Sequence, residues 1–202
     1  MWALVESNSI SKIYARPTAL QLGDIQYPRN IFELWTEAEL KAIGIYEITV
    51  DNTNLKDKEY YQNTDVTYTY NSSPDTVTGA YGTATAKSLT DVLYTATDES
   101  NGLGTEGELR TRGLKYRKKE TINGRANALL QKYDWYTLRA ASGGTAIPSS
   151  VSTYQAAVRT KANSMCTQID NAADVDALAA LYVYNDATPP VRPLGEFPDE
   201  PS

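Results

Sequence analysis

The sequence predicts an α+β protein in which strands come first and helices follow. Apolar and polar residues alternate with a period of two in short segments of residues 1–97, which is typical of half-buried strands. After a Gly-rich segment at 98–107, apolar residues recur at helical spacing over residues 108–187. Residues 188–202 contain five prolines and are predicted to be extended, either disordered or bound along a partner. We therefore expect a β-rich region, a hinge loop, a helical region and a Pro-rich tail, in this order.

Residues 1–51 are predicted to form an opening module of strands with one short helix. The expected elements are a hairpin of residues 2–6 and 10–14, an extended Tyr27 before Pro28, a helix at 36–43 and a strand at 45–50. Thr36 and Glu39 have the spacing of a capping box. Gly44 is a residue type that commonly follows the last turn of a helix, so the helix is expected to end there.

A second hairpin, rich in Tyr and Thr, is predicted within residues 58–86. Val66, Tyr68 and Tyr70 alternate with threonines, and the polar residues that follow have turn chemistry. The segment 76–85 is expected to return antiparallel to the first strand.

The boundary between the two regions is placed at the loop 98–107 because the chain changes there from strand-like to helix-like. The preceding residues 89–97 fit either a short helix or a further strand, since their apolar run is short. Gly113 and Gly124 leave open whether residues 108–131 form one long helix or two shorter ones.

The helical region is predicted to contain an antiparallel hairpin around a Gly/Pro loop. The first helix is expected to end at an aromatic cluster, with Trp135 packed where Leu130 and Tyr154 meet. Gly143 favours the end of the first helix, and Pro148 favours the start of the second. The second helix is expected to reach about residue 171 with an apolar stripe of Val151, Tyr154, Val158, Ala162, Met165 and Ile169. Asp174 is predicted to cap a short final helix.

The composition disfavours several classes of function. The chain has no histidine, which removes Ser-His and Cys-His catalysis and His-containing metal sites. A net charge of -6 disfavours a general nucleic-acid binder. The single Cys166 has no partner for an internal disulfide and is interpreted as a small buried residue. No apolar run approaches the roughly 20 residues of a membrane span, so we expect no membrane contact.

Three motifs suggest chemistry, but a structural role is favoured for each. Gly102, Gly104 and Gly107 match the spacing of a dinucleotide-binding loop, yet an acidic segment precedes them instead of a buried strand, which favours a hinge. The basic run at 110–119 is interpreted as a solvated helix surface paired with Glu108 and Glu120. The carboxylate pairs Glu37/Glu39 and Asp98/Glu99 are not assigned to catalysis, because Glu37 and Glu39 suit a helix start.

The aromatic residues are the candidates for partner contact. The chain has 15 Tyr against 2 Phe and 3 Trp, and tyrosine suits surfaces where the ring is covered and the hydroxyl stays wet. A core role is favoured for the tryptophans, whereas the Tyr face of 66–82 is expected to be exposed for protein contact. The partner-contact candidates are Tyr68, Tyr70, Tyr81, Trp135, Tyr136 and Phe197.

Two segments have residue patterns that are found in known proteins. Residues 122–160 combine a helix, a loop and a Tyr-containing helix, with Asp134, Trp135, Arg139, Pro148, Tyr154 and Arg159 at the matching positions. This pattern resembles the C-terminal region of tail-fibre assembly and tail-fibre-associated proteins. The segment 27–48 resembles the N-terminal module of such proteins through Trp35, Glu39, Leu40, Gly44 and Tyr46.

The resemblance implies a non-enzymatic phage tail structural protein that acts as an adaptor or tail-fibre attachment subunit. The alternative is a transient tail-fibre assembly chaperone, and a third is a carbohydrate-binding module that uses the aromatic face. The Tyr-rich strands and the Pro-rich tail favour the virion component. Its partners would be other phage tail or fibre proteins in an oligomeric assembly of the virion tail, built in the host cytoplasm. No catalytic residue, cofactor or metal is expected.

Overall fold

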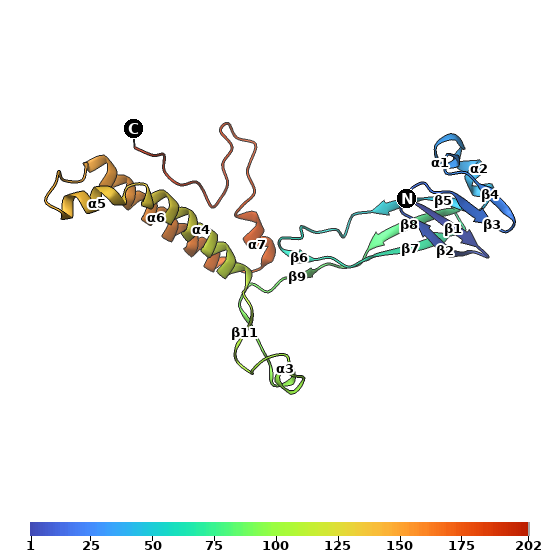
Figure 1. The fold of residues 1–202 in the computed structure, drawn as a ribbon, viewed down its shortest axis with the longest axis horizontal. Helices are drawn as coiled ribbons and strands as arrows, with labels where there is room; N and C mark the ends of the chain where they lie inside the picture. The colour runs from blue at the N-terminus through green and yellow to red at the C-terminus, as the bar shows by residue number, and fades with distance from the viewer. Residues whose placement is uncertain (202) are drawn as a thin grey trace. The chain divides into compact units, whose positions relative to one another are not determined.

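The computed structural model describes residues 1–201 and divides into two compact units, which meet in the sequence between Thr85 and Ala86. The first unit is rich in strands, and the second contains the long helices (Figure 1), so the predicted α+β class is confirmed. The predicted boundary at 98–107 is wrong. Those residues belong to the second unit, where they form the end of a protruding hairpin instead of a hinge.

The first unit is organised around a five-stranded sheet of order β2-β1-β5-β8-β7. Its strands are β1 (Trp2–Glu6), β2 (Ser9–Tyr14), β5 (Ile45–Asp51), β7 (Val66–Asn71) and β8 (Thr76–Tyr81). All neighbours are antiparallel except β5 and β8, which run parallel with Ile48 opposite Val77. Smaller elements complete the unit: the ladder of β3 (Leu20–Leu22) and β4 (Ile25–Tyr27), the helices α1 (Ile31–Leu34) and α2 (Glu37–Ala42), and the ladder of β6 (Tyr61–Gln62) and β9 (Thr85–Ala86).

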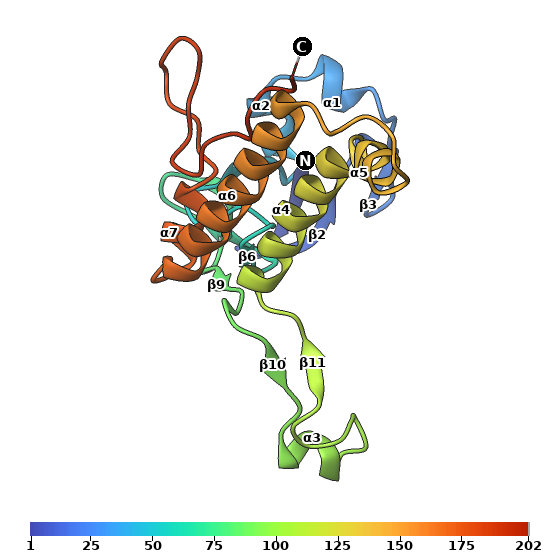
Figure 2. The same cartoon turned by 90° about the vertical axis from the view of Figure 1, so that its left-hand side faces the viewer.

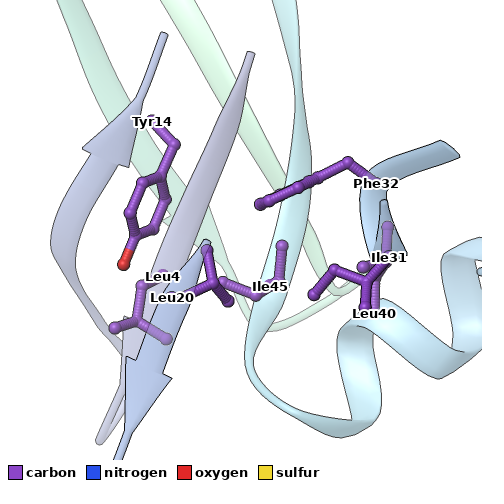
Figure 3. Close-up of a cluster of buried hydrophobic side chains, with 7 residues drawn as sticks. All are labelled: Leu4, Tyr14, Leu20, Ile31, Phe32, Leu40 and Ile45. Atoms are coloured by element: carbon purple, nitrogen blue, oxygen red, sulfur yellow. The ribbon is translucent and has the colours of Figure 1, made fainter. Parts of the chain in front are cut away.

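The sheet has a core on each face. Figure 3 shows the outer core, where Phe32 and Leu40 from the helices pack on Leu4 and Ile45 from the strands. The inner core contains Ala3, Tyr46, Ile48 and Val77, with Tyr68 and Tyr70 packed against it. The edge strands β2 and β7 come within 8 Å of each other, so the sheet curls around this second core.

The local predictions for the first unit are confirmed at both hairpins and at the capped helix. Thr36 accepts a hydrogen bond from the Glu39 backbone, and the Glu39 carboxylate accepts one from the Thr36 backbone at 2.8 Å, which completes the capping box. Gly44 follows α2 with φ of 78° and lies against the Val5 carbonyl. The sequence does not predict α1 or the β3–β4 ladder, because these elements are too short for a periodic signal.

The second unit is built on two antiparallel helices, α4 (Leu114–Gln131) and α6 (Ser149–Asn171), with α7 (Val175–Ala180) after them. The predicted stripe of α6 is confirmed, because all six of its residues are buried. Asp174 caps α7 by accepting a hydrogen bond from the Ala177 backbone at 2.7 Å, as predicted. The first helix is shorter than expected. It ends at Gln131, and α5 (Asp134–Ala141) follows as a separate helix.

Residues 88–113 form a protruding hairpin, which is named the arm. It contains β10 (Val92–Leu93), α3 (Ala96–Ser100) and β11 (Leu109–Thr111), and Figure 2 shows it extending away from α4 and α6. The open question at 89–97 is thus resolved as a strand followed by the start of a helix. Residues 108–131 contain a strand and one continuous helix, in which Gly124 is accommodated.

The Pro-rich tail packs on its own unit. It forms no helix or strand within the described residues, as predicted, but Leu194 is fully buried. The backbone of Leu194 donates to the Leu181 carbonyl at 3.1 Å and accepts a hydrogen bond from the Lys161 ammonium at 3.0 Å. Neither of the two expected states, disordered or bound along a partner, describes this tail, because one apolar residue anchors it to the helices.

Candidate functional site

An exposed aromatic surface lies on α5. Trp135 is 50% exposed and Leu138 is 68% exposed. The rings of Trp135 and Tyr136 lie 3.8 Å apart between centroids, and Tyr136 stacks on Tyr133 at 6.3 Å. Together, Trp135, Tyr136, Leu138 and Arg139 are named the α5 surface. Two of the sequence-predicted contact residues, Trp135 and Tyr136, therefore lie side by side.

Arg139 gives this surface a positive charge. Its guanidinium lies 4.9 Å from the ring centroid of Trp135 and 5.0 Å from that of Tyr136, because residues three and four apart share one face of a helix. Within residues 1–201 the guanidinium has no carboxylate partner, and its Nε is buried without a hydrogen bond. Aromatic rings beside an arginine are the residue types that carry most binding energy at interfaces. An unpaired guanidinium can also donate two parallel hydrogen bonds to a partner's carboxylate.

The expected packing of Trp135 between Leu130 and Tyr154 is wrong. Tyr133 takes that place, with its ring 5.3 Å from the ring of Tyr154 and nearly perpendicular to it. Tyr133 has non-helical backbone angles, φ of -112° and ψ of 1°, which separate α4 from α5 and turn Trp135 outward. Tyr154 is 5% exposed, and its burial raises the pKa of the phenol above the ordinary value.

The tyrosines of β7 and β8 do not form the exposed face that the sequence predicts. Tyr68, Tyr70 and Tyr81 are half-buried, and the first two pack against the inner core of the curled sheet. Close packing is evident at Gly79, where an added Cβ would lie 3.0 Å from the Tyr68 ring. The expectation overlooked the curl, which brings the two sheet edges together and covers this face.

Tyr70 has a further structural role. Its hydroxyl donates to Asp75 Oδ1 at 2.7 Å, and its ring meets that of Tyr46 at 5.3 Å. The hydrogen bond to Asp75 raises the pKa of Tyr70 well above its ordinary value and lowers the pKa of the Asp75 carboxyl. The polar end of this ring is therefore used to hold the turn between β7 and β8.

Phe197, the last predicted contact residue, is half-buried in the tail. The guanidinium of Arg125 lies 5.5 Å from its ring centroid, so the ring contacts α4 of the same chain. Further along the tail, Glu200 forms an ion pair with Lys132, beside the start of α5. Phe197 thus belongs to the tail's own attachment and does not join the α5 surface.

A polar groove of about 690 Å³ lies between α4 and α6. It is lined by Tyr116, Lys119, Glu120, Asn123, Gly124, Asn127, Asn163, Cys166 and Asp170. Lys119 and Asp170 form an ion pair at 2.7 Å, and Cys166 donates a weak hydrogen bond to Asn123. Burial raises the pKa of the Cys166 thiol, so it stays protonated near neutral pH and is a weak nucleophile.

The Gly motif has no nucleotide-binding context. Gly102, Gly104 and Gly107 lie in the arm, and β11 separates them from the start of α4, so they do not lead directly into a helix as the dinucleotide-binding motif requires. Gly104 instead lies under the ring of Tyr94, where an added Cβ would come within 2.5 Å of a ring carbon. These residues shape the end of the arm.

The basic run pairs with carboxylates that are distant in sequence. Across the arm, Arg110 forms an ion pair with Asp98 at 3.1 Å, and Arg112 forms one with Asp91 at 2.6 Å. The expected pairing with Glu108 and Glu120 is therefore wrong. The helix-local expectation fails because Arg110 belongs to β11 and Arg112 precedes α4.

The acidic pairs have structural partners. Glu39 and Asp98 each complete a capping box, and Glu37 forms an ion pair with Lys41 at 2.8 Å. Hydrogen bonds from the Thr36 and Thr95 caps lower the pKa values of Glu39 and Asp98. The lowered pKa values of Glu39 and Asp98 are the opposite of the raised pKa that a general acid requires.

Within residues 1–201, no group of three or more His, Cys, Asp or Glu residues is placed to hold a metal ion. No helix of this part of the chain combines the length and the apolar character needed to cross a membrane. Comparison with protein-family models, with curated proteins and with solved structures finds no match for this chain. The α5 surface is the candidate functional site, and a role for it is argued from its own residues.

Proposed function

We propose that this chain is a non-enzymatic structural protein of a bacteriophage tail, acting as an adaptor or tail-fibre attachment subunit through protein–protein contacts. The observation that carries the proposal is the α5 surface, where Trp135 and Leu138 are exposed next to an unpaired Arg139. The resemblance of residues 27–48 and 122–160 to tail-fibre-associated proteins supports the phage setting.

The division into two units supports an adaptor role. Each unit has its own buried residues, from Ile45 in the first to Ile169 in the second, so each is able to present a separate binding surface. Tyr46, Tyr68 and Tyr70 are engaged in the inner core, which disfavours a sugar-stacking platform on that face. Protein partners fit the available surfaces better than carbohydrate does.

Mass spectrometry of purified virions tests the proposal. We expect the chain in mature particles at a fixed ratio to other tail proteins. A phage carrying Trp135→Ser should incorporate less of the chain, whereas the matched control Val183→Ser, at a site 65% exposed in the same unit, should incorporate a normal amount. Absence of the wild-type chain from mature particles would refute the structural role and support the alternative, a transient tail-fibre assembly chaperone.

A further inference from the structure

The arm has no core of its own. None of residues 92–112 is buried, and the apolar side chains of Val92, Leu93, Leu103 and Leu109 are 38 to 57% exposed. A two-stranded hairpin alone is at best marginally stable in water. Exposed leucines concentrated on such a hairpin are typical of a surface that becomes covered by a partner.

Local polar contacts give the arm its shape before any partner binds. Thr95 and Asp98 form a capping box at the start of α3. Asp98 also pairs with Arg110, and Asp91 pairs with Arg112 while accepting a hydrogen bond from the Gly113 backbone at 2.8 Å. A preformed arm loses less conformational entropy on docking than a disordered segment does.

The charges of the arm complement those of the α5 surface. Glu99, Glu106 and Glu108 form no ion pair within residues 1–201, so the arm presents unpaired carboxylates beside its exposed leucines. Arg139 on the α5 surface is the matching unpaired cation, beside the exposed Trp135 and Leu138. Each surface thus combines an apolar patch with an unpaired charge whose sign is opposite to that of the other surface.

The two surfaces of one chain lie too far apart to meet. The arm joins α4 at Gly113, whereas α5 follows the other end of α4 (Figure 1). A helix of 18 residues is about 27 Å long, and the arm extends away from it (Figure 2). A contact between the arm and an α5 surface therefore requires a second copy.

We propose that copies of this chain associate head to tail, with the arm of one copy docked on the α5 surface of the next. Leu103 and Leu109 contact Trp135 and Leu138, and the arm carboxylates face Arg139. The contact joins two different surfaces, so an open chain keeps one of each unoccupied and grows until it closes into a ring or remains open. The inference deepens the proposed function, on which its biological setting rests.

Sedimentation of the purified full-length chain tests this arrangement. The wild type should associate increasingly with concentration, and Trp135→Ala should weaken the association roughly 5- to 30-fold. An arm variant, Leu103→Glu with Leu109→Glu, and an α5 variant, Trp135→Ser with Leu138→Ser, should each be monomeric alone. Mixed together they should form a 1:1 heterodimer and stop, because one intact arm and one intact α5 surface remain. The control Val183→Ser should associate as the wild type does.

Other outcomes overturn the inference. A wild type that stays monomeric at ~100 μM would exclude an association of useful strength. An α5 variant that dimerises alone would show arm-to-arm contact, and mixed variants that stay monomeric would exclude complementation, provided that circular dichroism shows both folded. If the chain is present in virions but monomeric in sedimentation, the head-to-tail contact is refuted and the proposed function is not. If the chain associates in sedimentation but is absent from virions, the proposed function is refuted and the head-to-tail contact is not.

Discussion

Replacing Leu194 with alanine is expected to destabilise the second unit by about 2.5–4 kcal/mol. Leu194 is 0% exposed although it lies in the Pro-rich tail. Removing its three outer carbons forfeits about 0.8 kcal/mol each, or about 2.4 kcal/mol in total. The cavity left behind adds to this loss because the surrounding helices relax only in part. The total cannot exceed the free energy that holds the tail in place, since an undocked tail no longer depends on this side chain.

Urea unfolding of the full-length chain, followed by the helical circular dichroism signal, measures the effect. The signal reports mainly on the second unit, which contains α4 and α6. With an m-value of roughly 1–3 kcal/mol/M, the midpoint should fall by about 1–4 M. The control Val191→Ala, at a tail position that is 53% exposed, should change stability by less than about 0.5 kcal/mol.

The result that would refute this reasoning is equal stability of Leu194→Ala and Val191→Ala. The tail would then not be packed in solution. Trp135→Ala provides a second comparison, because a side chain that is 50% exposed should cost less than about 1 kcal/mol. A loss of about 3 kcal/mol or more would instead place Trp135 in the core.

Three further changes test the local structure. Gly44→Ala should lower thermal stability by more than about 1 kcal/mol, because φ is 78° and a Cβ would lie 2.8 Å from the Val5 carbonyl; an unchanged melting temperature would contradict this. Asp174→Ala should cost about 1 kcal/mol in urea unfolding through the lost cap, and Asp174→Asn should retain most of the stability. Tyr70→Phe should flatten the loss of stability above pH ~10, which alkaline denaturation measures. Because the pKa of Tyr70 is raised in the folded state, its contribution to stability is complete below the pKa of the unfolded state and is lost as pH rises from there through the pKa of the folded state. The same variant should destabilise the chain less at acid pH than near neutral pH, because the lowered pKa of Asp75 contributes stability above pH ~4 that is lost as pH falls.

Short-range signals in the sequence were enough to predict several elements. The capping box of α2 needs only Thr36 and Glu39, and the cap of α7 needs only Asp174. The stripe of α6 was predicted residue by residue because a long amphipathic helix repeats its signal over six turns or so. In each case, the residues that specify the element are close neighbours in the chain.

The arm and the boundary between the units were missed for the opposite reason. The strands of the arm are two and three residues long, and their pairing joins Val92 to Thr111 across an intervening loop. No local period marks such a pair, and the change of composition at 98–107 predicts a boundary that the structure does not have there. The division at Thr85 follows instead from which residues contact one another.

The sequence by itself determined where most helices and hairpins form, whereas only the tertiary structure decided which side chains are available for contact. The curl of the sheet takes Tyr68 and Tyr70 into the inner core. The break at Tyr133 turns Trp135 outward, and the fit of Leu194 against the helices fixes the tail. Secondary structure depends largely on hydrogen bonds and side chains a few residues apart, but burial depends on packing between segments that are distant in sequence.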